Sequence, residues 1–313
     1  MKGRAILLEP GRAALVVDGR LEDLLIDDPS GAPAPGAVFD GRVDRLMPAM
    51  GGAFASLPVG QSFLRDARGL REGDHLQIQV TGYAEPGKAI PVTRRLLWKG
   101  RYVILTPGAP GINISRRIKR EEERARLTAL VEGAAPGVIL RSAAEDAPDE
   151  AIRTDLAEVL AAEASGVHPT DAHAVARREW SGEIIETPDA FDRLGATEQV
   201  ARLASPEVPL PSGGSMIIEP TRALVAVDIN TSGNGMTANV EACRDLLRQL
   251  RLRGLGGQIV LDPAPLKKAH RKKIEEISKA ACRLCPVETN IAGWTPLGHL
   301  ELQRKRERRP LFP

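Results

Sequence analysis

Between Ala37 and Thr93 the sequence consists of short apolar runs separated by glycine and proline, which leaves little choice of fold. Five strand-like runs fit into fewer than 60 residues, at Val38–Leu46, Ala53–Leu57, Ser62–Leu64, Leu76–Tyr83 and Ile90–Thr93. Short, closely spaced strands with turn residues between them are typical of a small closed barrel. The segment therefore predicts a barrel of the OB type, a fold that commonly presents one sheet face to single-stranded nucleic acid.

Two aromatic residues of this segment are candidate contacts for RNA bases. Phe54 and Phe63 fall on neighbouring predicted strands, and Lys88 lies near the rim of the predicted barrel. Bases of single-stranded nucleic acid stack on aromatic rings beside cations. In a chain with 3% aromatic residues, both rings could equally well belong to the core, and the sequence leaves these alternatives open.

Length and composition limit the class of protein. With 313 residues the chain can hold two or three compact units, because one hydrophobic core rarely grows to that size. No run approaches the roughly 18 apolar residues of a membrane span, and the charged start Met1-Lys2-Gly3-Arg4 lacks a signal-peptide apolar stretch. Three cysteines are too few for a disulfide framework. These features predict a cytoplasmic protein without a membrane partner.

The segments on either side of the barrel predict further parts. Residues 4–27 alternate apolar runs with turns, which indicates a small antiparallel sheet. After the barrel we expect a strand, a charged helix, a strand and an amphipathic helix, at Tyr102–Leu105, Lys119–Glu132, Val138–Ser142 and Asp146–Ala164. The pattern is weak over 165–206, where only Glu183–Glu186 is predicted as a strand.

The C-terminal third has the clearest pattern. It predicts a hairpin, a helix, a buried strand and a second helix, at Met216–Glu219 with Ala223–Asp228, then Ala238–Arg253, Gln258–Asp262 and Leu266–Cys282. Asp228 and Asp262 each stand at the carboxyl end of an apolar strand, where open sheets place ligand-binding groups. Two carboxylates with the Asn230 amide suit Mg²⁺, although an isolated aspartate after a strand is more often a turn former.

Basic residues are concentrated in the same third, although the formal net charge is only +2. The cluster comprises Arg244, Arg248, Arg251, Arg253, Lys267, Lys268, Arg271, Lys272 and Lys273, and a second basic run covers 304–309. Such runs are often solvated faces, but their concentration in one region favours a polyanion partner.

Three ordered stretches then point to a known family. Residues 210–232, Asn239–Ala242 and Arg248–Asp262 resemble the catalytic core of the ribonuclease E/G family. Upstream, Gly41-Arg-Val, Ala53-Phe-Ala and Ser62-Phe-Leu resemble its OB-type RNA-binding domain, while Gly111–Ile118, Glu121–Glu123 and Gly137–Ala143 resemble its sensor for a 5′-monophosphorylated end. The resemblance covers nearly the whole chain and suggests a divergent, catalytic-domain-only member of alphaproteobacterial type.

The resemblance implies an α+β multidomain fold with an OB-type barrel inserted next to a ribonuclease-H-like subdomain. The expected parts are N-terminal strands of the ribonuclease-H-like subdomain (1–35), the barrel (36–97), a 5′-phosphate sensor (98–164), a trimmed ribonuclease-H-like remainder (165–208) and a deoxyribonuclease-I-like α/β catalytic subdomain (209–313). The segment before Leu210 is short for the family, which is why the remainder is expected to be trimmed.

The resemblance also assigns roles to single residues. Asp228 matches the first magnesium-binding aspartate, and Asn230 matches an asparagine that supports the reaction. Arg141 and Ser142 match the Arg-Thr pair of the 5′-phosphate pocket, where a guanidinium and a hydroxyl suit a terminal phosphate. Lys88 and the two barrel phenylalanines, Phe54 and Phe63, match RNA-contacting positions.

The sequence departs from the family at the second metal ligand. Pro265 stands where the family has its second metal-binding aspartate, and Asp262, three positions earlier, is the candidate substitute metal ligand and catalytic residue. Pro296 replaces an arginine of the family. The family's zinc-sharing cysteine motif is absent, because Cys282 and Cys285 do not stand at its place in the sequence. No zinc is therefore expected, and a homodimer would form without the zinc-sharing motif.

Three functions remain open from the sequence. The first is endoribonucleolytic cleavage of single-stranded RNA with Mg²⁺, or Mn²⁺ in its place, in RNA processing or decay. The second is a catalytically impaired RNA-binding paralogue, because Pro265 and Pro296 both replace functional side chains. A protein-binding scaffold is the third, and the basic cluster argues against it. For Cys282 and Cys285 the alternatives are incidental thiols, a metal site or a redox site.

Overall fold

The computed structural model describes residues 3–312, which form two compact units. One unit combines the residues up to Ile26 with those from Gly182 onward, and the other spans Asp27–Ser181. Met1 and Lys2, which belong to the charged start, lie outside the described residues. No helix within 3–312 is both long and apolar enough to cross a lipid bilayer.

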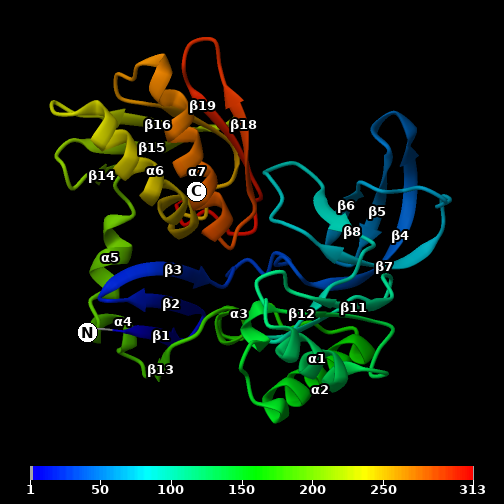
Figure 1. Cartoon of the computed structure of the whole chain (residues 1–313). Coiled ribbons are helices and arrows are strands. Elements are labelled where there is room, and N and C mark those ends of the chain that lie inside the picture. The colour runs from blue at the N-terminus through cyan, green and yellow to red at the C-terminus, as the bar shows by residue number, and fades with distance from the viewer. Residues whose placement is uncertain (1–2, 313) are drawn as a thin grey trace. The chain divides into compact units, whose positions relative to one another are not determined.

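The segment from Val38 to Thr93 forms a closed barrel (Figure 1). Its strands are β4 (Val38–Met47), β5 (Gly52–Leu57), β6 (Gly60–Leu64), β7 (His75–Val80) and β8 (Ile90–Thr93), in the order β4-β5-β6-β8-β7. Strands β6 and β8 are parallel and the other pairs are antiparallel. Apolar side chains fill the interior, among them Ala55, Leu64 and Ile78. The predicted strands and their closure into a barrel are confirmed.

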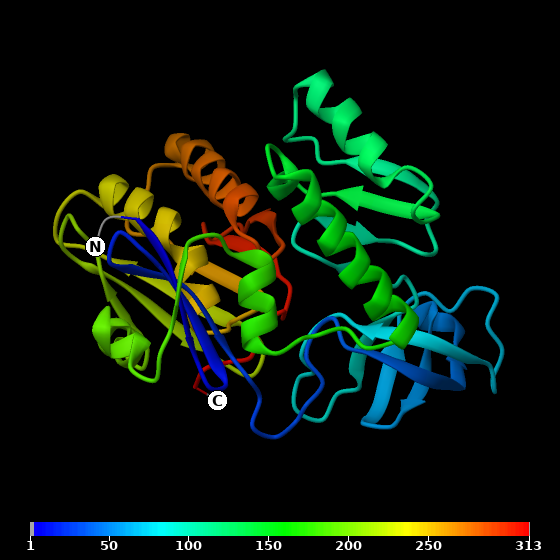
Figure 2. The same cartoon turned by 90° about the horizontal axis from the view of Figure 1, so that it is seen from below.

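The rest of this unit is a four-stranded sheet with helices against it (Figure 2). The strands, in sheet order, are β11 (Gly111–Ile114), β12 (Gly137–Leu140), β10 (Val103–Leu105) and β9 (Trp98–Lys99). The helices against the sheet are α1 (Glu121–Val131) and α2 (Asp149–Ser165); α3 (Ala172–Glu179) follows α2 along the chain, and a short 3₁₀ turn, η2, lies at Ser142–Ala144. Trp98, Leu127 and Ile152 are fully buried between the sheet and the helices.

A buried carboxylate ties α2 to the sheet. Asp155 accepts the backbone N–H groups of Arg101, Tyr102 and Val103 at 2.7, 2.7 and 2.9 Å. Gly100 precedes them, and a Cβ there would lie only 2.4 Å from the Asp155 carboxylate. Because unpaired buried N–H groups are costly, Asp155 fixes the path of the β9–β10 turn and the position of the Gly100 carbonyl.

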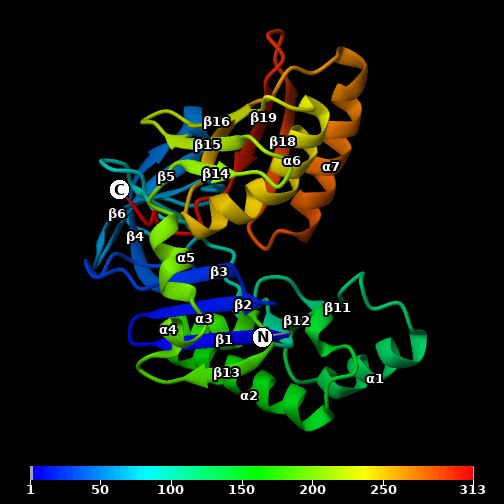
Figure 3. The same cartoon turned by 90° about the vertical axis from the view of Figure 1, so that its left-hand side faces the viewer.

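The other unit begins with a four-stranded sheet in the order β13-β1-β2-β3 (Figure 3). Its strands are β1 (Arg4–Glu9), β2 (Arg12–Val17), β3 (Arg20–Ile26) and β13 (Glu183–Glu186), and the short helices α4 (Ala190–Arg193) and α5 (Ala196–Arg202) follow. The predicted antiparallel sheet over 4–27 is confirmed, and so is the predicted strand at Glu183–Glu186, which pairs in parallel with β1.

A six-stranded mixed sheet forms the larger part of this unit (Figure 1). Its order is β14 (Glu207–Pro209), β15 (Ser215–Pro220), β16 (Val225–Asn230), β17 (Gly257–Asp262), β19 (Leu300–Arg304) and β18 (Thr289–Trp294). Helices α6 (Gly235–Leu252) and α7 (Arg271–Leu284) contribute Leu246, Leu250 and Ile274 to its core. The predicted helix from Leu266 begins later: Lys267 is extended and a 3₁₀ turn, η3 (Lys268–His270), precedes α7.

Candidate active site and nucleic-acid interface

The alternation of side chains along β16 separates a core side from an open side. Val225, Val227 and Ile229 are buried in the core that the helices share, whereas Asp228 and Asn230 are exposed. Period-two alternation produces this separation, because successive side chains of a strand point to opposite faces. The two polar groups predicted for chemistry therefore lie on one side of the sheet.

The structure brings the two candidate metal ligands together. Strands β16 and β17 are parallel neighbours, and Asp228 is the register partner of Asp262. Both are exposed, and neighbouring strands lie about 4.8 Å apart, so the two carboxylates project side by side from one face. The Asn230 side-chain amide donates to Asp228 Oδ2 at 2.6 Å, which orients that carboxylate.

Pro265 lies on a loop that α6 holds in place. The buried Asn239 side chain accepts the Ala264 N–H and donates to the Ala264 carbonyl oxygen, both at 2.9 Å. A Cβ on Gly235 would lie 2.9 Å from the Pro265 carbonyl oxygen, so this loop packs closely against the start of α6. Pro265 itself has no side-chain ligand, and the nearest carboxylate along the chain is that of Asp262.

A histidine that the sequence reasoning did not single out stands next to Asp262. His299 Nε2 lies 3.7 Å from Asp262 Oδ1, at the start of β19. The turn that carries it is closed by two hydrogen bonds between Thr295 and His299, at 2.9 and 3.1 Å. No spacing rule indicates this pair, because the 295–299 turn reaches Asp262 only through the β17–β19 pairing.

Seven of the nine residues of the predicted basic cluster fall into two groups. Three arginines of α6 and its end are used internally: Arg248 bonds to Asp245, Arg251 to the Glu22 carbonyl oxygen, and Arg253 to the Ser205 carbonyl oxygen. By contrast, Lys267, Lys268, Lys272 and Lys273 are exposed around the start of α7. This exposed group begins five residues after Asp262 along the chain, and the polyanion surface is smaller than the sequence suggests.

The donor set at the carboxylate pair suits Mg²⁺ better than a softer metal. Within the described chain, no three or more His, Cys, Asp or Glu side chains are close enough to share one ion. Zinc sites require three or four such ligands, whereas Mg²⁺ keeps several waters and needs only one or two carboxylates. The Asp228 and Asp262 carboxylates with the Asn230 amide therefore fit a magnesium ion.

On the barrel, Phe54 and Phe63 are not part of the core. They are register partners on β5 and β6, and their ring centroids are 5.3 Å apart. Both rings are half-buried, whereas the residues before and after each of them along the strand are buried and face inward. The register continues the row to Arg45 on β4 and Pro91 on β8. Of the two alternatives that the sequence left open, the surface position is correct.

Lys88 does not join this aromatic row directly. Its Nζ forms an ion pair with Glu85 at 2.6 Å, and no cation–π contact links it to either ring in the described part of the chain. Arg45, the register partner of Phe54, is the exposed cation beside the rings. The sequence reasoning missed Arg45 because a β-bulge between Val43 and Arg45 shifts the register.

Arg141 and Ser142 lie together at the end of β12. One guanidinium nitrogen of Arg141 donates to the Gly100 carbonyl oxygen, and another to Glu179 Oε2, both at 2.5 Å. Ser142 starts the 3₁₀ turn beside it. No motif indicates Glu179, the Arg141 partner at the end of α3, because α3 lies in the weakly patterned segment.

The surroundings of Glu179 carry an excess of positive charge. Burial raises the pKa of Glu179, but Arg141, Arg178 and Lys99 together lower it below its ordinary value. His168 packs edge-on against Trp98, and burial, with repulsion from Arg178 and Lys99, lowers its pKa to about 4. His168 is therefore neutral at pH 7. Three cations act on the Glu179 carboxylate, and one of them, Arg178, also interacts with Asp171, so cations outnumber carboxylates in this group. An anion brought to this cluster would gain attraction.

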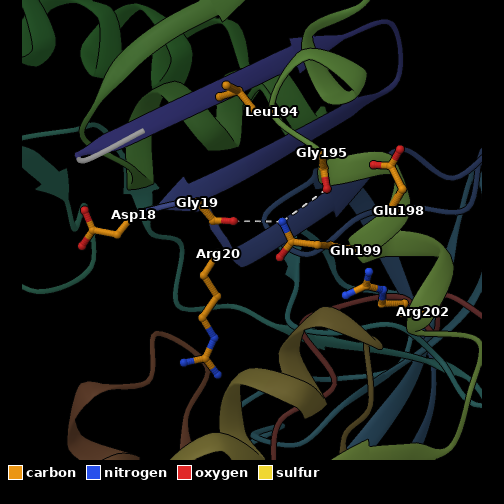
Figure 4. A pocket seen from close by; sticks show the side chains of 8 residues that line it. All are labelled: Asp18, Gly19, Arg20, Leu194, Gly195, Glu198, Gln199 and Arg202. Carbon is orange, nitrogen blue, oxygen red and sulfur yellow. Dashed lines mark hydrogen bonds between the residues drawn. The ribbon is translucent and has the colours of Figure 1, made fainter.

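A shallow depression of about 570 Å³ in the unit that contains the six-stranded sheet holds none of these residues (Figure 4). Its lining combines the β2–β3 turn with α5 and includes Asp18, Arg20, Glu198 and Arg202. Gln199 bridges its two sides by donating to the carbonyl oxygens of Gly19 and Gly195 at 3.0 and 3.3 Å. These bonds fasten α5 to the small sheet, which indicates a structural role.

Comparison with known proteins agrees with this arrangement. The sequence profile described as the Ribonuclease E/G family matches residues 98–174 and 164–307. The chain is 27% identical to ribonuclease E of Synechocystis over 96% of its length, and to ribonuclease G of Haemophilus influenzae at the same identity and coverage. It is 26% identical to ribonuclease G of Escherichia coli K12 over 95% of its length.

These relatives are longer than this chain. It spans 56% of the Synechocystis ribonuclease E and 78% of the Haemophilus ribonuclease G. The alignment with the former is 380 residues long, against 313 residues in the whole chain, so many aligned positions of the relative have no counterpart here. With more than half of its residues matched by the family profile, the chain belongs to the Ribonuclease E/G family.

Proposed function

We propose that this protein is an endoribonuclease that cuts single-stranded RNA in RNA processing or decay, with Mg²⁺ or Mn²⁺ as cofactor. The observation that supports this most strongly is the register pairing of Asp228 with Asp262 on the exposed side of the six-stranded sheet. The family supports the reaction class, since the similar proteins are named ribonuclease E and ribonuclease G.

The proposed roles follow from the contacts of each side chain. Asp228 and Asp262 would hold the ion, which would supply positive charge to a scissile phosphate and acidify a bound water. Asn230 fixes the Asp228 carboxylate through its 2.6 Å hydrogen bond. Asp262 would take the place of the carboxylate that is missing at Pro265, and His299, just before β19, lies 3.7 Å from it. The exposed lysines around the start of α7 would bind the RNA backbone.

RNA recognition is assigned to the other unit. The barrel, as an OB-type domain, would stack bases on Phe54 and Phe63, with Arg45 and Lys88 near the backbone. Arg141 and Ser142 would bind a 5′-terminal phosphate, and the cationic excess around Glu179 supplies the attraction. The five-part division of the chain, with ribonuclease-H-like and deoxyribonuclease-I-like subdomains, belongs to the same proposal, as do a cytoplasmic location and a homodimer.

The decisive experiment compares cleavage and binding in one sample. A fluorescent, A/U-rich RNA with a 5′-monophosphate is incubated with Mg²⁺ or Mn²⁺, and both product formation and RNA binding are measured. Asp228→Ala should abolish cleavage and leave binding intact or tighter, since it removes a negative charge that repels phosphate. Glu219→Gln is the matched control, because it neutralises an exposed carboxylate of β15 in the same sheet.

Two results would contradict the proposal. If Asp228→Ala cleaves like the unchanged protein, the activity comes from another site or from a contaminant. If the unchanged protein binds RNA in a salt-sensitive way but cuts it with neither metal, the site has decayed and the chain is the RNA-binding paralogue that Pro265 suggests.

A further inference from the structure

A second set of reactive side chains stands at the C-terminal end of α7. Cys282 and Cys285 are three residues apart, half-buried and not joined by a disulfide. The Cys285 N–H donates to the Ala281 carbonyl oxygen at 3.0 Å, so the last helical turn includes Cys285. Residues three apart on a helix share one side of it. The proposed ribonuclease site uses neither thiol.

The Cys285 sulfur lies between two guanidinium groups. Its Sγ is 3.3 Å from Nη1 of Arg304 and 3.5 Å from Nη1 of Arg251. Arg304 is only 1% exposed, and its Nη2 finds no hydrogen-bond acceptor among residues 3–312. A buried cation with an incomplete set of acceptors stabilises any anion next to it.

The charges around Arg251 do not balance while Cys285 is a neutral thiol. Arg251 and Arg308 approach the buried Asp23 carboxylate at 3.3 and 3.4 Å, and Glu22 lies 3.9 Å from Arg251. Arg304 adds a further guanidinium, and Glu22 is shared with Arg20 at 3.7 Å, so the ion pairs of this group within residues 3–312 contain more guanidiniums than carboxylates. A thiolate at Cys285 would supply the missing negative charge.

The three cysteines differ in acidity in the way that these contacts require. Burial raises the pKa of the Cys285 thiol, but the attraction of Arg304 and Arg251 outweighs it and lowers that pKa below its ordinary value. Burial raises the pKa of Cys282, and it raises the pKa of Cys243 to about 11. The thiolate is the reactive form of cysteine, so Cys285 is the nucleophile of the three.

The same contacts argue against a metal site here. A zinc ion would add two positive charges beside two guanidiniums. It would also need three or four ligands, and residues 3–312 contain no His, Cys, Asp or Glu group of that size. Of the uses that the sequence left open for this Cys-x-x-Cys pair, redox chemistry is the one that matches its surroundings.

We infer that Cys285 and Cys282 form a redox-active dithiol, in which Cys285 reacts with hydroperoxides and Cys282 resolves the product. The Cys285 thiolate attacks the terminal oxygen of the hydroperoxide; the O–O bond breaks, the alkoxide leaves and takes up a proton, and Cys285 becomes a sulfenic acid. The Cys282 thiol then attacks that sulfur, an S–S bond forms, and water leaves.

Closing the disulfide requires a small local change. Side chains three apart on a helix have Cβ atoms about 5–6 Å apart, whereas a disulfide needs about 3.5–4.5 Å. Cys285 is the residue at which α7 ends, with an extended ψ of 130°. Tightening of the last turn, which is common at helix ends, brings the two sulfurs together without disturbing the sheet.

The test measures the thiols directly and needs no RNA. The full chain, reduced and freed of reductant, is alkylated with iodoacetamide over a pH series, and labelling is quantified at each cysteine by peptide mass spectrometry. The alkylation rate of Cys285 should reach half its maximum at a lower pH in the folded protein than in the urea-unfolded protein. Near pH 7, Cys285 should be alkylated about tenfold faster than Cys243, or more. Hydrogen peroxide should then produce a 282–285 disulfide.

Variants separate the two roles. Cys282→Ser should keep fast alkylation of Cys285 but form no disulfide, whereas Cys285→Ser should lose the fast-reacting thiol. The inference is overturned if Cys285 titrates as in the unfolded chain, if peroxide leaves both thiols reduced, or if the purified protein carries one zinc ion per chain that is lost in both variants.

Discussion

Arg141, which the family motif indicates as a phosphate ligand, is bound by a residue outside that motif, Glu179. Its guanidinium is not free in the absence of RNA, because it bonds to the Glu179 carboxylate and the Gly100 carbonyl oxygen. A 5′-phosphate bound as we propose would compete with Glu179 for the same N–H groups. The role of Arg141 in binding a 5′-phosphate stays a prediction, and the structure adds that Glu179 already accepts from its guanidinium.

This competition predicts opposite effects for the two partners. Arg141→Ala should abolish any preference for 5′-monophosphate over 5′-hydroxyl RNA, because the charged donor is lost. Glu179→Gln should strengthen the preference, by about tenfold, because a charge-assisted acceptor is replaced by a weaker one. Competition binding with the two RNAs measures both effects, and Glu158→Gln, exposed on α2, is the control. An unchanged preference in Arg141→Ala would rule out the sensor.

His168 predicts a pH dependence of stability. Its pKa is depressed to about 4 in the folded protein, against 6.5 for an unperturbed histidine, so between these values the unfolded chain binds the proton more strongly. Unfolding free energy should fall as the pH drops from about 6.5 to about 4, by roughly 1–3 kcal/mol, and level off below.

Urea unfolding at several pH values tests this. His168→Gln should remove most of that slope, whereas His75→Gln, which removes an exposed histidine of the barrel, should leave it in place. A slope that persists in His168→Gln would show that another group is responsible.

At the scale of elements, the sequence predicts regular strands and long helices well. The barrel strands follow from period-two runs between glycine and proline, and α6 from its apolar stripe. The helices α3, α4 and α5 were not predicted, because four to eight residues are too few to show helical periodicity. The alternation of side chains along β5 and β6 does not show which face of the sheet points into the barrel. Only the structure of the closed barrel shows that Phe54 and Phe63 lie on the outer face.

The half-buried Phe54–Phe63 pair on the barrel surface predicts a specific loss of RNA affinity. Phe54→Ala and Phe63→Ala should each weaken binding of single-stranded RNA by roughly 1–3 kcal/mol, because a base loses its stacking partner. The barrel should stay folded, since neither ring belongs to its core. Fluorescence anisotropy measures the affinity, with Val59→Ala, an exposed apolar residue of the same barrel, as control. Equal affinity in all three variants would place the RNA elsewhere.

At the scale of the whole molecule, the organisation depends on pairings between distant segments. Strand β1 pairs with β13 about 180 residues later, and this contact assigns the N-terminal strands to the same unit as the six-stranded sheet. Local patterns carry no information about such a pairing. The same holds for the site: Asp228 and Asp262 were predicted from their strand ends, whereas His299 depends on the β17–β19 pairing.

The exposed lysines predict the salt dependence of RNA binding. Each phosphate contact contributes about 0.7 to the slope of log affinity against log salt for single strands. Lys272→Gln and Lys273→Gln should each reduce the slope by about that amount. Lys279→Gln, on the same helix but paired with Glu275, should not. Unchanged slopes in the first two variants would exclude this surface from the RNA path.

Asp262, in the function proposed above, supplies the carboxylate that is missing at Pro265. Single-turnover cleavage across a Mg²⁺ titration, with the unchanged protein and Asp262→Asn, tests it most directly. We predict that the variant loses at least about a hundredfold in rate, or needs far more Mg²⁺, while RNA binding is kept, because a metal-bound carboxylate contributes several kcal/mol. If Asp262→Asn cleaves RNA at the original rate and with the original Mg²⁺ requirement, Asp262 is not a ligand of the metal.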